Sequence, residues 1–245
     1  SIINLQPKLE MAKVANNRLN EVYLVESEFA KTRPIKQVQS LQENIRFEHV
    51  NFKYGYGRNI LNDINLTISK GSKLTIVGMS GSGKTTLAKL LVGFFDVAPD
   101  QGQILINQHN LSEVDRTTLR QYINYVPQEP FIFSGTILAN LTLGSRPNLT
   151  QAEIESACAA AEIQADIEQM PQGYATELTE SGAALSGGQK QRLSIARALL
   201  SPAQIFIFDE STSNLDTITE RKIVDHLLRL PDKTIIFVAH RLNIA

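Results

Sequence analysis

The sequence predicts an α/β fold, in which helices flank a mostly parallel core sheet and a smaller antiparallel sheet lies beside it. Residues 205–208 and 235–238 are continuous apolar runs, which are typical of strands buried on both faces of a parallel sheet. Strands that alternate along the chain with helical segments produce such a sheet. Residues 45–52 and 64–68 instead alternate apolar with polar side chains, which predicts half-exposed antiparallel strands.

The first forty residues differ in pattern from the rest of the chain. Apolar residues recur at three- and four-residue spacing over residues 1–30, which predicts a helix. Residues 31–44 contain Pro34 and several glutamines and are typical of a linker. We therefore expect a helical extension over residues 1–40, followed by one domain over residues 41–245.

Short apolar runs and helix caps predict the remaining elements of this domain. Thr150 and Glu153 form the pattern of a capping box, and Asp216 is a suitable cap for the helix that follows it. We expect further strands at residues 74–77, 104–106 and 123–126, and helices near residues 116–121, 136–142 and 189–200.

Composition limits the class of protein. The formal net charge of 245 residues is −1, with acidic and basic residues interleaved, which argues against a general nucleic-acid binder. The single cysteine, Cys158, cannot form an internal disulfide, so a reducing compartment is favoured. No apolar run approaches the ~20 residues needed to cross a bilayer.

Residues 78–85 carry the most specific motif. They read GMSGSGKT and fit the pattern G-x-x-x-x-G-K-[ST] at every fixed position. The glycines let successive N–H groups curl around an anion, and the following helix adds the positive end of its dipole. Lys84 supplies charge for the β- and γ-phosphates, and Thr85 supplies a hydroxyl for Mg²⁺. A glycine-rich turn without a ligand is the alternative, and the order strand, loop, helix argues against it.

Asp209 and Glu210 end the first buried apolar run. Carboxylates at the C-terminal end of a parallel strand face the crevice where ligands bind in such sheets. Asp209 is therefore a candidate for holding Mg²⁺, and Glu210 for orienting or deprotonating the water that attacks the γ-phosphate. A solvated strand end is the alternative interpretation.

Residues 185–189, Leu-Ser-Gly-Gly-Gln, precede a predicted helix. Ser186 and Gln189 form a capping box, while the two glycines leave N–H groups bare for a phosphate. With this pentapeptide the chain resembles the nucleotide-binding domain of ATP-binding cassette (ABC) transporters, which are P-loop NTPases with a helical signature subdomain. The resemblance runs from about Ile45 to His240.

Four further motifs follow the order of this family. Tyr54 resembles the A-loop aromatic that stacks on adenine, and Gln128 the Q-loop glutamine that reaches Mg²⁺ and senses the transporter. Asp216 closes a D-loop that has Asn214 where alanine is commoner, and His240 resembles the H-loop histidine that contacts the γ-phosphate. The resemblance therefore implies the cofactors ATP and Mg²⁺.

The resemblance implies catalytic roles for Lys84, Gln128, Glu210 and His240, and metal ligands at Thr85, Gln128 and Asp209. It implies nucleotide contacts at Tyr54, Ser80, Gly81, Ser82, Gly83, Lys84, Thr85, Thr86, Ser186, Gly187, Gly188, Gln189, Asp209 and Asp216. In the family two such domains pair head to tail, with ATP between the phosphate loop of one and the signature helix of the other. We therefore expect a homodimer with two active sites.

Local features narrow the resemblance to exporters. Residues 129–137 are similar to the stretch after the Q-loop in exporters, and residues 1–30 are placed like the segment that joins the ATPase to the last membrane helix. Residues 176–182 depart from the usual exporter pattern T-x-V-G-E-R-G. Together with Asn214, they are more similar to bacterial exporters of bacteriocins and competence-signalling peptides. This implies a fused transmembrane domain, a peptide cargo and a location at the cytoplasmic face of the bacterial membrane.

Other functions stay open at this point. One is a lipid or drug exporter. Another is a soluble ABC ATPase of translation or DNA repair. Such proteins usually have a second cassette, or a long coiled coil between the phosphate loop and the signature, whereas ordinary helices separate Lys84 from Ser186 here, which disfavours this interpretation. A third is a binding module that does not hydrolyse ATP, against which Glu210 argues. The chain ends five residues after His240, where the family usually continues, so a truncated C-terminal end is an open expectation.

Overall fold

The computed structural model describes residues 42–239. The predicted N-terminal helix and His240 lie outside the described residues. Among the described helices, none combines the length and the apolar character that a membrane span requires.

A four-stranded parallel sheet forms the centre of the described domain, as predicted. Its strand order is β3-β10-β9-β6, and every neighbouring pair is parallel. The strands are β3 (Lys73–Val77), β10 (Thr234–Ala239), β9 (Ile205–Asp209) and β6 (Ile123–Val126). Residues of β9 and β10 are buried on both faces, which explains why their sequences are continuously apolar.

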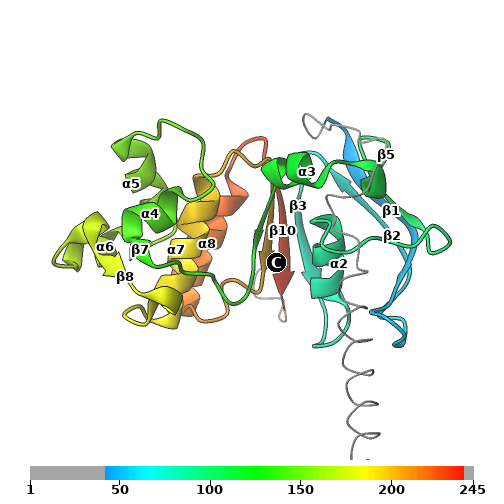
Figure 1. Cartoon of the computed structure of the whole chain (residues 1–245), viewed down its shortest axis with the longest axis horizontal. Helices are drawn as coiled ribbons and strands as arrows, with labels where there is room; N and C mark the ends of the chain where they lie inside the picture. The colour runs from blue at the N-terminus through cyan, green and yellow to red at the C-terminus, as the bar shows by residue number, and fades with distance from the viewer. Residues whose placement is uncertain (1–41, 240–245) are drawn as a thin grey trace, which may run out of the picture. The chain divides into compact units, whose positions relative to one another are not determined.

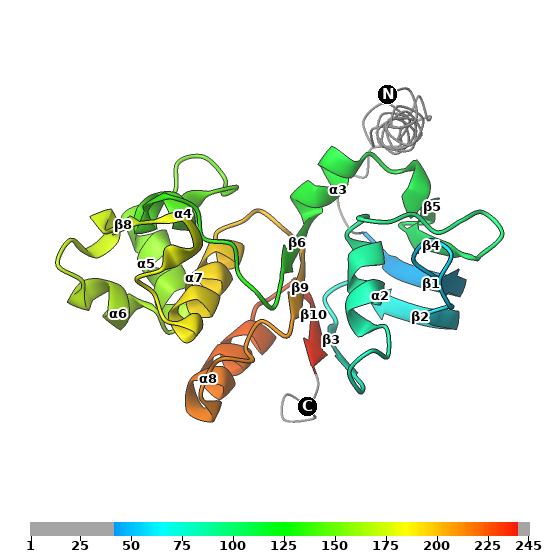
Figure 2. The same cartoon turned by 60° about the horizontal axis from the view of Figure 1, so that its bottom comes forward.

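The two faces of this sheet belong to two different hydrophobic cores. Phe206 and Phe208 of β9 belong to a core that includes residues of the helices α7 (Gly187–Leu199) and α8 (Thr217–Leu228). Ile205 and Ile207 belong to a second core, with the helix α2 (Lys84–Leu91) and the antiparallel sheet. The parallel sheet therefore lies between α8 on one side and α2 on the other (Figure 2).

The antiparallel sheet was also predicted, and its strand order is β2-β1-β4-β5. Its strands are β1 (Asn44–Phe52), β2 (Leu61–Ser69), β4 (Gln103–Ile106) and β5 (His109–Asn110). Figure 1 shows it beyond α2, on the opposite side of the core from α7 and α8. The two-residue strand β5 was not predicted, because so short a segment carries no periodicity.

Helices on the other side of the molecule form the predicted helical subdomain. They are α4 (Ile137–Thr142), α5 (Gln151–Ala160), α6 (Gln164–Gln169) and α7, and α3 (Arg116–Tyr122) precedes β6. The capping boxes at Thr150 and Ser186 are present. Because Ser186 is the cap, α7 begins at Gly187, two residues before the predicted start. The helix α6 and the small pair β7 (Gly135–Thr136) and β8 (Glu177–Leu178) were not predicted.

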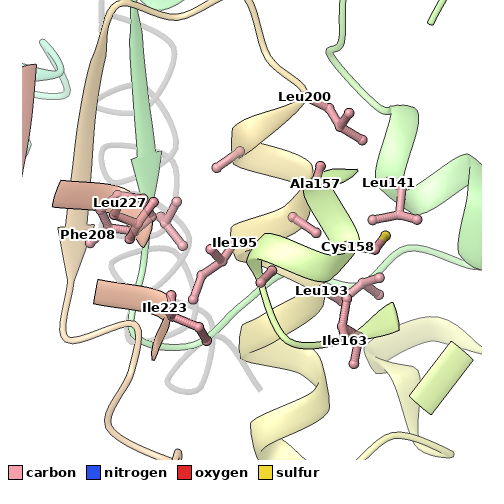
Figure 3. Packing of buried hydrophobic residues seen from close by; sticks show 14 of the residues in the cluster. Leu141, Ala157, Cys158, Ile163, Leu193, Ile195, Leu200, Phe208, Ile223 and Leu227 are labelled. Atoms are coloured by element: carbon pink, nitrogen blue, oxygen red, sulfur yellow. The ribbon is translucent and has the colours of Figure 1, made fainter. Parts of the chain in front are cut away.

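Helix α7 joins the helical subdomain to the parallel sheet. Leu193 packs on one side of α7, toward Cys158 of α5 and Ile163 (Figure 3). Ile195 lies on the side that faces β9 and α8, near Ile223. Cys158 is fully buried, and burial raises the pKa of its thiol to about 11.

Candidate functional site

The phosphate loop connects β3 to α2, as predicted. Two of its glycines occupy positions where a side chain would be strained or would clash. Gly81 and Gly83 have φ angles of 80° and 91°, in the left-handed region that favours glycine. A Cβ atom at Gly83 would lie 2.7 Å from Cδ2 of Leu61. The loop therefore passes close to the start of β2, at a distance that only glycine allows.

Lys84, the first residue of α2, is folded against this loop. Its Nζ atom donates hydrogen bonds to the carbonyl oxygens of Gly78, at 2.7 Å, and Met79, at 2.9 Å. The side chain is buried. The ammonium group is thus held at the centre of the loop, in contact with two carbonyl dipoles that phosphate oxygens can replace.

Asp209, at the end of β9, receives a hydroxyl hydrogen bond on each carboxylate oxygen. Thr85 Oγ1 donates to Oδ1 at 3.1 Å, and the Tyr125 hydroxyl donates to Oδ2 at 2.7 Å. Asp209 is only 2% exposed, so these donors replace water. Burial, and then the contact with Asp209, raises the pKa of Tyr125.

A cavity of about 290 Å³ lies over the phosphate loop. Its walls combine the loop with Gln128, which follows β6, and Glu210, which follows β9. The residues that line it are Ile60, Ser80, Gly81, Gly83, Lys84, Thr85, Thr86, Gln128 and Glu210. The structure therefore brings together the phosphate loop, the Q-loop glutamine and the predicted catalytic acid.

The backbone of Glu210 has an unusual conformation. Its φ angle is 50°, which costs a residue with a Cβ atom about 1 kcal/mol or more. Its N–H group donates a hydrogen bond to the carbonyl oxygen of Val238 at 2.9 Å, so the neighbouring strand holds the turn. Strained backbone of this kind clusters at functional sites, and here it directs the chain sharply away from β9 beside the cavity.

Tyr54 lies next to the phosphate loop rather than in the lining of the cavity. Its hydroxyl donates to Thr86 Oγ1 at 3.2 Å, and its ring makes edge contacts with Phe52 and Phe95, each with ring centroids 5.0 Å apart. The residue is 39% exposed. An exposed aromatic surface therefore lies beside the helix that begins at the phosphate loop.

The signature motif lies away from this cavity within the chain. Ser186 and Gly187 are exposed, and neither residue lines the cavity. The Gln189 side chain, which completes the capping box, also donates to Asp166 Oδ1 at 2.8 Å. Asp216 accepts hydrogen bonds from the N–H groups of Ile218 and Thr219 in α8, and it too lies outside the lining. The Thr219 side chain, and then these N–H groups, lower its pKa.

Sequence reasoning missed two residues beside the predicted motifs, Tyr125 and Gln191. Gln191 of α7 is fully buried. Its Nε2 atom donates to the carbonyl oxygen of Gln128 and to Ser213 Oγ, both at 3.2 Å, and its Oε1 atom accepts from the N–H of Asn214 at 3.0 Å. It therefore links the signature helix to the Q-loop and the D-loop. Gln191 stands between Lys190 and Arg192 in the sequence, so no local pattern distinguished it.

A family model described as "ABC transporter" matches residues 61–213. The chain belongs to the ABC transporter family. This confirms the predicted P-loop NTPase fold and the ATPase class of the domain.

Known ABC proteins are similar to this domain over most or all of its length. The pediocin PA-1 transport/processing ATP-binding protein PedD of Pediococcus acidilactici is 71% identical over 100% of this chain and 34% of that protein. ComA, a transport/processing ATP-binding protein of Streptococcus pneumoniae, is 56% identical over the same shares. The structure of a bacterial Atm1-family ABC exporter with ATP bound matches 95% of this chain and 40% of that chain, with a TM-score of 0.83 and 35% identity. The chain thus spans about a third of the length of these curated relatives.

Proposed function

We propose that this ABC domain binds and hydrolyses ATP with Mg²⁺, and that hydrolysis drives the export of a peptide through a membrane domain of the same protein. The observation that carries the proposal is the cavity over the phosphate loop, in which Lys84, Thr85, Gln128 and Glu210 share one lining. A nucleophile-orienting acid and a phosphate-binding loop in one cavity are the parts that phosphoryl transfer to water requires.

Each part of the cavity has a distinct task in this proposal. The loop amides, the N-terminus of α2 and Lys84 bind the β- and γ-phosphates. A water oxygen attacks the γ-phosphorus in line, the bond to the β–γ bridging oxygen breaks, and ADP leaves. Glu210 orients the attacking water and accepts its proton. Gln128 helps to position the reacting groups, and His240, outside the described residues, is proposed to contact the γ-phosphate.

The donor set at this site fits Mg²⁺. Thr85 offers a hydroxyl and Asp209 a carboxylate, 3.1 Å apart, and Gln128 offers an amide oxygen nearby in the cavity lining. Within residues 42–239 no cluster of three or more His, Cys, Asp or Glu side chains could enclose a metal ion. Mg²⁺ typically binds through a few protein oxygens, with phosphate oxygens and water completing its shell. The ion supplies positive charge that neutralises the β- and γ-phosphates.

A second copy of the chain completes the site in this proposal. The exposed N-terminus of α7, with Ser186, Gly187, Gly188 and Gln189, is a helix end suited to a phosphate. Because it lies outside the cavity of its own chain, we propose that it faces the nucleotide of a partner copy. Asp216 lies in the D-loop beside that contact. The resulting homodimer contains two equivalent ATP sites.

The proposed cargo is a bacteriocin or a competence-signalling peptide. This rests on the names of the relatives, which include pediocin, lactococcin and mesentericin transport/processing proteins. We propose that residues 1–40 join the ATPase, over residues 41–245, to a fused transmembrane domain, with the ATPase at the cytoplasmic face of a bacterial membrane. Full-length protein in proteoliposomes, given a bacteriocin or a competence-signalling peptide, tests this: ATP-dependent transport of the peptide is expected, and no transport above the level without ATP would contradict it.

Substitution of Glu210 tests the hydrolytic mechanism. Glu210→Gln is expected to slow ATP turnover by about 100-fold or more, because an amide cannot accept the proton of the attacking water. The variant is also expected to bind ATP and to accumulate a dimer, measured by light scattering after size-exclusion chromatography. The exposed Glu155→Gln on α5 is the control. Unchanged turnover of Glu210→Gln contradicts the role assigned to this residue.

A further inference from the structure

Within residues 42–239, two hydroxyl groups donate hydrogen bonds to the Asp209 carboxylate, those of Thr85 and Tyr125, and the motifs of the family give Tyr125 no role. Its hydroxyl lies 2.7 Å from Asp209 Oδ2, the shorter of the two hydrogen bonds to this carboxylate. Each carboxylate oxygen therefore has one hydroxyl donor, Thr85 on Oδ1 and Tyr125 on Oδ2. Because Asp209 is almost fully buried, the orientation of the carboxylate depends on these two donors.

The strand register explains how Tyr125 reaches Asp209. In the parallel pair of β6 with β9, Tyr125 lies opposite Ile207. Residues two apart on a strand share a face, so Asp209 lies on the same face as Tyr125, one step along the diagonal. A phenol ring is long enough to span that diagonal. The contact therefore follows from pairing between segments that are far apart in the sequence.

The ring of Tyr125 also packs against an aromatic side chain that follows α2. Phe94, which follows α2, makes an edge contact with it, with ring centroids 5.8 Å apart and planes at 88°. Thr85, at the start of α2, holds the opposite oxygen of Asp209. Both ends of the phosphate-loop helix are thus linked to Asp209, one directly and the other through Tyr125.

We propose that Tyr125 is a positioning residue, which fixes the Asp209 carboxylate for the divalent cation that accompanies the nucleotide. The inference rests on the proposed function and adds a determinant of metal affinity to it. A carboxylate turns easily about its terminal torsion, which has no sharp staggered minima. When Thr85 Oγ1 coordinates the cation, the hydrogen bond from the Tyr125 hydroxyl still fixes the orientation of the Asp209 carboxylate.

Tyr125→Phe tests this proposal, because it removes the hydroxyl and keeps the ring. Tyr174→Phe is the matched control: its hydroxyl donates to Gln164 in the helical subdomain, remote from the cavity lining. ATP affinity of the 245-residue chain is measured by titration calorimetry in excess Mg²⁺ and again in EDTA. The variant is expected to bind ATP normally in EDTA. Its gain in affinity on adding Mg²⁺ is expected to fall by about tenfold, since hydrogen bonds to charged groups are the strong ones.

A second readout separates positioning from a general structural effect. The Mg²⁺ concentration for half-maximal ATP turnover is expected to rise by a similar factor in Tyr125→Phe, while turnover recovers in excess Mg²⁺. An unchanged Mg²⁺ dependence overturns the proposal. An equal loss of affinity with and without Mg²⁺ also overturns it, because that result reports damage to the whole site. Failure of the wild-type chain to bind ATP in Mg²⁺ overturns the proposed function itself, and this inference with it.

Discussion

Replacing Asn140 with alanine is expected to destabilise the protein by about 3 kcal/mol. Asn140 lies on α4 and is 2% exposed, yet the oxygen and the nitrogen of its side chain each make two hydrogen bonds. Its Oδ1 atom accepts from the N–H of Phe133 at 2.9 Å and from Arg197 Nη2 at 3.0 Å. Its Nδ2 atom donates to the carbonyl oxygens of Phe133, at 2.9 Å, and Thr136, at 3.1 Å.

The magnitude follows from what alanine leaves behind. A typical buried hydrogen bond contributes about 1 kcal/mol net, and an unsatisfied buried partner costs about 1–3 kcal/mol. Arg197 keeps its bonds to the carbonyl oxygens of Asn140 and Phe131, both at 2.7 Å, so its charge stays partly compensated. The expected loss of stability therefore corresponds to about three of the four hydrogen bonds of the Asn140 side chain, or about 3 kcal/mol. For a chain of this size the melting temperature is expected to fall by about 6–12 °C.

Urea unfolding, monitored by circular dichroism, measures this loss as a lower midpoint at an unchanged slope. Asn59→Ala is the control, because Asn59 is exposed and exposed substitutions change stability by about 0.5 kcal/mol or less. Hydrogen exchange of residues 131–136 is expected to accelerate together with the global loss. A destabilisation of Asn140→Ala no larger than that of the control would refute the reasoning.

Three further predictions concern the site and the core. Lys84→Ala is expected to lose most ATP binding, measured by calorimetry, because it removes the positive charge at the centre of the phosphate loop. Gln191→Leu is expected to cost about 1–3 kcal/mol in urea unfolding, since it removes the three hydrogen bonds that this buried side chain makes to the Q-loop and the D-loop. The raised pKa of Cys158, about 11 against a usual 9.0, means that the unfolded chain loses the thiol proton first as pH rises. Stability is therefore expected to fall more steeply in wild type than in Cys158→Ala between about pH 9 and pH 11.

Each of these has a result that contradicts it. ATP affinity of Lys84→Ala close to that of wild type is incompatible with the role of the ammonium, and Lys190→Ala is its control. Gln191→Leu as stable as wild type would show that the three contacts of this side chain contribute nothing. Parallel stability curves for wild type and Cys158→Ala in the alkaline range would show that the thiol titrates equally in both states.

Much of the fold could be predicted, because its signals are local. The paired apolar runs of β9 and β10 predicted central strands, and the cap at Ser186 predicted the start of α7 to within two residues. The elements that were missed are short: β5, α6 and the pair β7 and β8. Segments of two to six residues contain too few periods for a pattern, and their conformation depends on the neighbours they pack against.

The sequence also predicted every residue of the cavity lining except Ile60: Ser80, Gly81, Gly83, Lys84, Thr85, Thr86, Gln128 and Glu210. It could not place Tyr54 outside that lining, and it gave no reason to single out Gln191. The pairing of Ser186 and its neighbours with a second copy stays a prediction, as does the role of His240. The first concerns a surface that meets a partner copy, which a single chain does not contain, and the second concerns a residue outside those that the structure describes.

The amino-acid sequence by itself determined the family, the phosphate-binding loop and the identity of the acids at the end of β9. These depend on residue types at short, fixed spacings, which any reader of the chain can check. Tertiary structure alone decided that Tyr125 and Thr85 hold opposite oxygens of Asp209, and that Gln191 joins three motifs. Those contacts arise from strand register and helix packing between segments as many as 124 residues apart, and no local pattern encodes such a distance.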